Sequence, residues 1–217
     1  MSSSPTAPTS TTSSSTSSAS SRAALIACGA IAQPCKEIVD RHDWPVDVHP
    51  LPPLLHNQPH LIADEVRRLV ADLRPSYSSV VVGYADCGTY GALDALCDEL
   101  DLPRLPGLHC YDLYAGPSRI KTFFTEQPGT YLLTDFLVRS FARTVLQELG
   151  LDRYPDLRDT YFGNYTRVVW LAQQPDDELR RLATEAAERI GLPLTVVETG
   201  DARLEAALAA LLNHRLV

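Results

Sequence analysis

Short apolar runs alternate with amphipathic segments along most of this chain. The runs at 23–27, 79–84, 130–134 and 167–172 are typical of strands that are buried on both faces of a sheet. Segment 59–73 instead spaces its apolar residues three and four positions apart, as an amphipathic helix does. Strands that alternate with helices predict an α/β fold with a doubly wound, mainly parallel sheet in a Rossmann-like, three-layer arrangement.

Shorter or weaker patterns complete the predicted order of elements. Further strands are expected at 46–51, 102–108 and 194–198, and further helices at 30–41, 91–100, 135–149, 175–190 and 202–213. Residues 151–166 form a polar, aromatic-rich insertion. Ligands of such sheets bind beyond the carboxyl ends of the strands, so loops that follow strands are the places to look for a site. The last two strand–helix units carry no convergent polar motif and are expected to be scaffold.

The N-terminal segment differs from the rest in composition. Residues 1–21 contain no charged side chain and consist almost entirely of Ser, Thr, Ala and Pro, which predicts a disordered tail. Residues 22–217 are expected to form a single α/β domain. The tail lacks the basic start and apolar centre of a secretory signal. The odd number of cysteines, five, also argues against a disulfide framework, so a cytoplasmic protein is expected.

Charge and hydropathy exclude several classes of partner. The formal net charge of −8 argues against binding to nucleic acid or to anionic membranes, which requires clustered Lys and Arg. No apolar run approaches the roughly 18 residues of a transmembrane helix. Neither G-x-G-x-x-G nor GxxxxGK[ST] is present, so sites for NAD or ATP are not supported.

Three of the five cysteines follow predicted strands, namely Cys28, Cys87 and Cys110. Because the carboxyl ends of parallel strands meet at one edge of a sheet, their thiolates are expected to share one site. Three thiolates suit a zinc ion that keeps a fourth position open, or a [4Fe–4S] cluster with one open iron. Zinc would require sulfurs within about 4 Å of one another, and a cluster roughly 6–7 Å. Buried inert thiols and a single nucleophilic cysteine are the alternatives.

The other two cysteines are weaker candidates. Cys35 and Cys97 fall inside predicted helices at core-like spacing. No CxxC pair occurs anywhere in the chain, so the local signature of a zinc ribbon or of a thioredoxin-type motif is missing.

Polar residues near the same strand ends supply candidates for catalysis and binding. His56, Asp86, His109 and Asp135 are the catalytic candidates, as groups that move protons or position a substrate. The candidates for contact with a cofactor or substrate are Gly29, Gly88, Thr89, Tyr111, Thr134 and Asn164. Thr134 followed by Asp135 also fits an ordinary helix N-cap with an acid in its first turn.

Several strings of residues, in order, resemble a bacterial and archaeal domain of unknown function, family 1638. They are ACGA at 27–30, PPLLHN at 52–57, GYADCGT at 83–89, HCY at 109–111, GTYLLTDF at 129–136, LDRYP at 151–155 and YFGNY at 161–165. The resemblance covers about residues 23–212. It implies that the motif cysteines of the family correspond to Cys28, Cys87 and Cys110. Members are often encoded beside corrinoid-dependent methyltransferases of methylamine-type metabolism.

Two functions of different class follow. The first is a metal- or iron–sulfur-dependent enzyme that acts on a small polar substrate, with amine or one-carbon metabolism as the context that the resemblance implies. The second is a non-catalytic metal-binding accessory protein that serves a corrinoid-dependent methyltransferase system, with a corrinoid or methyltransferase protein as partner. The chain lacks a D-x-H-x-x-G loop, so it is not expected to hold cobalamin itself.

Overall fold

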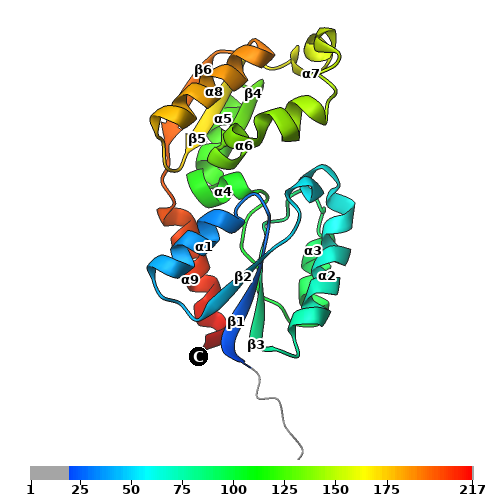
Figure 1. Ribbon diagram of the computed structural model, residues 1–217, viewed down its shortest axis with the longest axis vertical. Coiled ribbons are helices and arrows are strands. Elements are labelled where there is room, and N and C mark those ends of the chain that lie inside the picture. The colour runs from blue at the N-terminus through cyan, green and yellow to red at the C-terminus, as the bar shows by residue number, and fades with distance from the viewer. Residues whose placement is uncertain (1–19, 217) are drawn as a thin grey trace, which may run out of the picture.

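The computed structural model describes residues 20–216 and shows two lobes, each built on a parallel three-stranded sheet (Figure 1). The first sheet has the order β2-β1-β3 and the second the order β4-β5-β6. The strands are β1 (Ser20–Ala27), β2 (Val46–Pro50), β3 (Tyr77–Gly83), β4 (Thr130–Thr134), β5 (Arg167–Ala172) and β6 (Leu194–Glu198). All of the paired strands run parallel. The predicted α/β class with parallel strands is therefore confirmed, with the strands divided between two sheets.

The boundary between the sheets falls in the segment after β3. The strand expected at 102–108 is only an isolated bridge between Val82 and Arg104. The chain then forms two short helices, α4 (Cys110–Ala115) and α5 (Pro117–Glu126), before β4 begins the second sheet. The low strand propensity of the two prolines in 102–108 agrees with this break.

Helices cover both faces of the first sheet. In Figure 1, α1 (Ala32–Arg41) and the C-terminal α9 (Ala202–Leu216) lie on one face, and α2 (Ile62–Leu73) and α3 (Ala92–Leu100) lie on the other. Helix α2 has the amphipathic pattern that the spacing of its apolar residues predicts. Its residues Ile62, Val66, Val70 and Leu73 are buried, and its intervening charged residues are exposed.

The second lobe contains α6 (Asp135–Phe141), α7 (Arg158–Phe162) and α8 (Asp177–Ile190). The predicted helix at 135–149 is present, but it changes to a π-helix over Ala142–Gln147. Helix α8 begins where the Asp176 carboxylate accepts a hydrogen bond of 2.6 Å from the Leu179 N–H, and it ends at Gly191, whose φ is +73°. The predicted insertion at 151–166 contains α7 and a short 3₁₀ turn at Pro155–Leu157.

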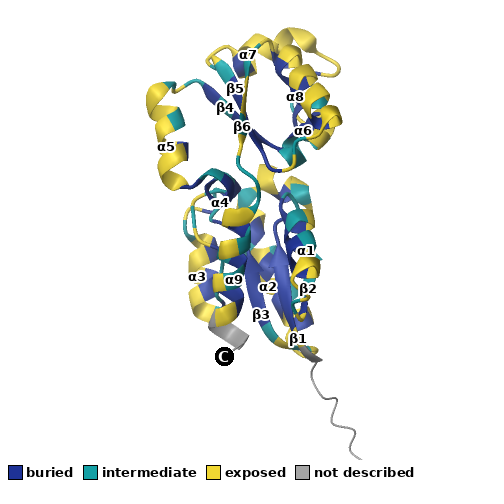
Figure 2. Cartoon of the chain, turned by 90° about the vertical axis from the view of Figure 1, so that its left-hand side faces the viewer, coloured by how far each residue is buried: buried dark blue, intermediate teal, exposed yellow. Residues whose placement is uncertain are grey.

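The chain passes between the lobes twice. It leaves the first lobe at Gly116, and it returns at Gly200, with φ angles of +81° and +62°. The returning helix α9 completes the core of the first lobe, where Leu204, Leu208 and Leu211 are buried. The second lobe has separate clusters of buried residues, one of which contains Trp170 (Figure 2). The two lobes are thus connected by two crossings of the chain, and α9 belongs to the first lobe.

The predicted tail lies almost wholly outside the described residues, which begin with β1 at Ser20. Within 20–216, no helix combines the length and the hydropathy that crossing a membrane requires.

Candidate functional site

The structure places Cys28, Cys87 and Cys110 in neighbouring loops of the first lobe, and all three are buried. Cys28 follows β1, Cys87 lies in the loop after β3, and Cys110 is the first residue of α4. Backbone hydrogen bonds hold the loops together: the Cys28 N–H donates to Gly83 at 3.0 Å, and the Cys87 N–H donates to the Leu108 carbonyl at 2.8 Å. The three cysteines therefore lie on loops that are side by side.

The electrostatics of the thiols also reflects this proximity. Burial, followed by the charge of Cys28, raises the pKa of Cys87 to about 12. Burial, followed by the charges of Cys87 and Cys28, raises the pKa of Cys110 well above its ordinary value. Each thiol is thus close enough to the others to influence their ionisation. In the absence of a bound cation, all three are protonated at neutral pH.

Tyr84 lies among these three cysteines. Its side chain is 1% exposed, and its buried hydroxyl lies within hydrogen-bond reach of the Cys28 thiol. Burial raises the pKa of this phenol, and the charges of Cys28, Cys87 and Cys110 raise it further. Tyr84 and the three thiols therefore belong to one buried polar cluster.

The loop that carries Cys87 has a strained backbone. Cys87 and Tyr90 adopt left-handed conformations with φ of +50° and +51°, and Gly88 has a φ of +84°. Outside glycine, Asn and Asp, this region is costly and tends to occur at functional sites. Asp86 holds the loop in place, because its carboxylate accepts hydrogen bonds from the Thr89 hydroxyl (2.5 Å) and from the Gly91 N–H (3.0 Å).

Three predicted site residues therefore shape this loop. Asp86, Gly88 and Thr89 form the turn around Cys87, and none of them lines a cavity next to the thiols. Burial acts to raise the pKa of Asp86, but the hydrogen bonds from Thr89 and from the backbone outweigh it, so the pKa is lowered. Gly29 has an equivalent role after β1: a Cβ there would collide with the Leu51 carbonyl oxygen and with Pro53.

A cavity of about 400 Å³ lies between the lobes, next to Cys110. We call it the large cavity. It brings together four of the predicted residues, Cys110, His56, Tyr111 and Thr134. Its other lining residues are Ala30, Pro53, Leu54, Asn57, Tyr131, Phe136, Leu137, Thr144, Val145, Glu148 and Leu149. The lining is mostly apolar and contains no Lys or Arg, which is typical of a site for a small organic molecule.

The two predicted histidines approach this cavity from adjacent loops. His56 lies at its edge in the 3₁₀ turn Pro53–Asn57, where enclosure by the protein, followed by the charge of His109, lowers its pKa below the ordinary value. His109 immediately precedes α4, and its ring is tilted against Tyr111 with 6.0 Å between centroids. His109 and Asp112 form a capping box at the start of α4: the His109 ring accepts from the Asp112 N–H, and the Asp112 carboxylate accepts from the His109 N–H at 3.3 Å. The His109 Nδ1 also lies 3.5 Å from an Asp112 oxygen.

Thr134 and Asp135 begin α6, as a helix N-cap and an acid in the first turn. The Thr134 hydroxyl accepts a hydrogen bond of 3.4 Å from the Leu137 N–H. The Asp135 carboxylate accepts hydrogen bonds from the Trp170 indole (2.8 Å) and from the Gln174 N–H (2.8 Å), which ties α6 to the loop after β5. Asp135 therefore has a structural role, and it also lines a second cavity described below.

Asn164 does not reach the site. It is exposed in the loop before β5, at the amino edge of the second sheet, whereas Thr134 and Asp135 lie at the carboxyl edge. Neither cavity next to the thiols includes it among its lining residues. Tyr161 and Tyr165 belong to the same edge, where Tyr165 packs on Tyr131 with 5.2 Å between ring centroids.

Several lining residues have no signal in the sequence. Thr144, Val145 and Glu148 reach the large cavity from the π-helix and the turn after it. Glu148 also meets the other lobe, because its carboxylate is 3.5 Å from the Asn57 amide nitrogen. The amphipathic pattern of 135–149 predicts a regular α-helix, and no local residue signals the change to π geometry, which is frequent at functional sites.

The described residues contain no group of three or more His, Cys, Asp or Glu side chains arranged to hold one metal ion. Cys35 on α1 and Cys97 on α3 are buried in the first core, as expected. All five cysteines are free thiols.

Fold and site together define a two-lobed α/β protein with a mostly apolar cavity between its lobes and three buried cysteines, one of which lines that cavity. The chain matches the family described as "Protein of unknown function (DUF1638)" over residues 50–208, and it belongs to this family. The matched region includes Cys87 and Cys110, whereas Cys28 precedes it. Comparison with curated proteins and with solved structures found no match.

Proposed function

We propose that this protein is an enzyme that acts on a small organic molecule in the large cavity, beside a metal centre held by Cys28, Cys87 and Cys110. The observation that carries the proposal is that these three buried cysteines come from separate neighbouring loops around Tyr84, and that Cys110 lines that cavity. Inert core cysteines do not require a strained loop such as the one that carries Cys87.

A zinc ion and a [4Fe–4S] cluster are the two metal centres that three thiolates could hold. A single zinc ion draws its ligands to about 2.3 Å from one centre. Cluster ligands bind different irons and therefore lie farther apart. A cluster held by three cysteines supplies an open iron that can bind or reduce a substrate.

The chain itself provides the groups that would bind a substrate and move protons. His56 has a lowered pKa and is neutral at pH 7, so its ring can accept a proton at the edge of the cavity. Glu148 lies opposite on the second lobe and can exchange a proton or pair with a positive group. The rings of Tyr111, Tyr131 and Phe136 form apolar walls that exclude water and orient the substrate.

Anaerobic purification with metal and sulfide analysis tests this proposal. Iron and sulfide in near-equal amounts, with a broad absorption near ~400 nm, are expected of the cluster. Cys28→Ala, Cys87→Ala and Cys110→Ala should each lose iron, whereas Cys35→Ala and Cys97→Ala, the matched controls in the same core, should retain it. Stoichiometric zinc in colourless protein would show that the three cysteines hold zinc and not a cluster. Metal-free protein from anaerobic cells, or equal losses in all five variants, would contradict both.

A second candidate is the accessory protein that carries a metal for a corrinoid-dependent methyltransferase system. Exposed apolar side chains around the cysteine loops favour it: Tyr90 is 96% exposed and Leu108 is 66% exposed. Hydrogen bonds from Asp86 and Cys87 to residues 107 and 108 hold these loops side by side, so the two side chains belong to one surface. Iron that is transferred stoichiometrically to a partner, without turnover of a small molecule, would distinguish this function from the enzyme.

A further inference from the structure

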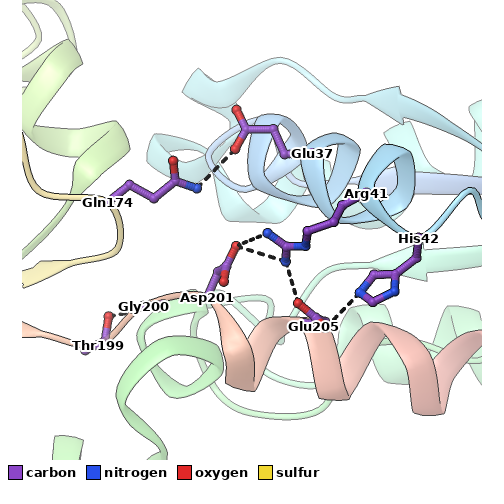
Figure 3. Close-up of polar contacts among 8 residues, drawn as sticks. All are labelled: Glu37, Arg41, His42, Gln174, Thr199, Gly200, Asp201 and Glu205. Carbon is purple, nitrogen blue, oxygen red and sulfur yellow. Dashed lines mark hydrogen bonds and ion pairs between the residues drawn. The ribbon is translucent and has the colours of Figure 1, made fainter.

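A second cavity of about 150 Å³ lies beside the large one, and we call it the small cavity. Three of its residues follow the strands of the second sheet: Asp135 after β4, Gln174 after β5 and Asp201 after β6. Helix α1 of the first lobe supplies Glu37. Figure 3 shows Glu37 and Gln174 facing each other between the lobes, where the amide of Gln174 is 3.3 Å from the Glu37 carboxylate. The strand ends that the sequence marks as scaffold thus form part of a cavity.

Two carboxylates of the small cavity are not neutralised. Glu37 accepts hydrogen bonds only from neutral amides, that of Gln33 at 2.8 Å and that of Gln174 at 3.3 Å. Asp135 accepts only from the Trp170 indole and from backbone N–H groups. Within residues 20–216, neither carboxylate forms an ion pair with a basic side chain.

The other charged residues of the small cavity do have partners. Asp201 is paired with Arg41 at 3.4 Å, as Figure 3 shows, and Arg139 lies 3.6 Å from Asp176. The lining therefore has two uncompensated negative charges, those of Glu37 and Asp135. A positive group placed between them would gain attraction from both.

Tyr114 gives an independent sign of a ligand. It belongs to α4, is only 4% exposed and lines the small cavity. No hydrogen bond within the described residues involves its hydroxyl. Burial and the nearby thiols raise the pKa of Tyr114, and the charge of Asp135 adds to this effect, so the phenol and the Asp135 carboxylate lie near each other. Because Tyr114 lines the cavity and its hydroxyl has no protein partner among the described residues, a ligand bound there can supply one.

Metal ions and anions fit this arrangement less well. The described residues contain no group of three metal ligands. The N-termini of α6 and α9 border the cavity and would favour an anion, but Asp135 and Asp201 already place carboxylates at these two ends.

We propose that the small cavity binds the protonated amine of a small organic molecule, which donates hydrogen bonds to Glu37, Asp135 and the Tyr114 hydroxyl oxygen. Ammonium and guanidinium groups have the required charge and donors. The site shares Ala30 and Phe136 with the large cavity, so the rest of such a ligand can extend into the larger space. The proposal does not depend on the cysteines, and it can be tested with metal-free protein.

Calorimetric titration of the full chain with matched probes tests the site. Methylammonium, butylammonium and benzylammonium are the cationic probes, and butyrate, 1-butanol and inorganic phosphate are the controls. We expect saturable binding of at least one ammonium ion, and none of butyrate or butanol. Glu37→Gln, which keeps the shape of the side chain, should weaken binding about 10-fold or more, because it removes a charged acceptor.

Control variants separate binding from folding. Glu198→Gln removes one negative charge outside the cavity and should bind as the unmodified chain does. Tyr114→Phe should weaken binding about 3-fold to 10-fold, and it tests the site independently if Glu37→Gln does not fold. Phosphate or butyrate binding as tightly as the ammonium ions, no saturable ammonium binding, or unchanged affinity in both variants would overturn the proposal.

Discussion

The guanidinium group of Arg203 lies against Gly116: a methyl group on this glycine would be 3.0 Å from Arg203 Cζ. Gly116 is the residue at which the chain leaves the first lobe, and Arg203 lies in the first turn of α9, just after the chain returns. The two connections between the lobes are therefore adjacent in space, although they are far apart in sequence.

Gly116→Ala should destabilise the protein by about 2–3 kcal/mol. Gly116 has φ and ψ of +81° and +147°, a conformation that is costly for residues with a Cβ, and the new methyl group would also displace Arg203. Urea denaturation followed by circular dichroism measures the change. Gly200→Ala is the matched control: its φ is +62° with no atom within 4 Å of the added Cβ, so a loss of only about 1 kcal/mol is expected. Equal losses would show that contact with Arg203 adds nothing.

Leu208→Ala in α9 should destabilise the first lobe by about 2–5 kcal/mol. Leu208 is fully buried, so the substitution leaves a cavity in the core that α9 completes. Chemical denaturation measures the loss, and Ala209→Ser at a half-exposed position of the same helix is the control. A chain that ends after Gly200 should fail to fold its first lobe, and a stably folded product would contradict this view of α9.

The thiols of metal-free protein should alkylate slowly. Because burial and Cys28 raise the pKa of Cys87 to about 12, its thiolate fraction at pH 8 is about a thousandfold below that of an ordinary thiol of pKa 9.0. Its rate with iodoacetamide, followed by mass spectrometry, should still rise tenfold per pH unit between pH 9 and 11. In guanidinium chloride all five cysteines should react with ordinary profiles. A native rate for Cys87 that levels off near pH 9 would contradict the burial.

Asp86 should contribute to stability in acid. Its hydrogen bonds hold the folded-state pKa below the unfolded value, so its stabilising effect is present above the unfolded pKa and disappears as pH falls through the folded pKa. Asp86→Asn should therefore lower the melting temperature at pH 6 and have less effect below about pH 4. Asp98→Asn, at an exposed position of α3, serves as the control. An effect of Asp86→Asn that grows as the pH falls would contradict this assignment.

The sequence predicted individual elements better than it predicted their assembly. Apolar runs such as 79–84 and 167–172 became strands because burial on both faces requires continuous apolar sequence. Nothing in these runs specifies which strands pair, so the division into two sheets was not foreseen. That Cys28, Cys87 and Cys110 lie on neighbouring loops was foreseen, because it depends only on parallel strands ending at one edge.

The parts of the site that the sequence did not reveal depend on how the two lobes face each other. Glu37 and Gln174 meet only because α1 of one lobe faces the second sheet of the other. Glu148 faces the large cavity after a π-helix that has no local signature. Asn164 was assigned to the site from its place in a motif, but it precedes β5 and lies at the opposite edge of its sheet.

The paired crossings at Gly116 and Gly200 have a mechanical consequence. Two lobes joined by a single connection could rotate relative to each other about any axis. Two adjacent connections leave mainly a hinge motion about the line that joins them. The distance between the cavity walls on the two lobes then depends on one hinge angle. One pair of spectroscopic labels, one on each lobe, is enough to follow it.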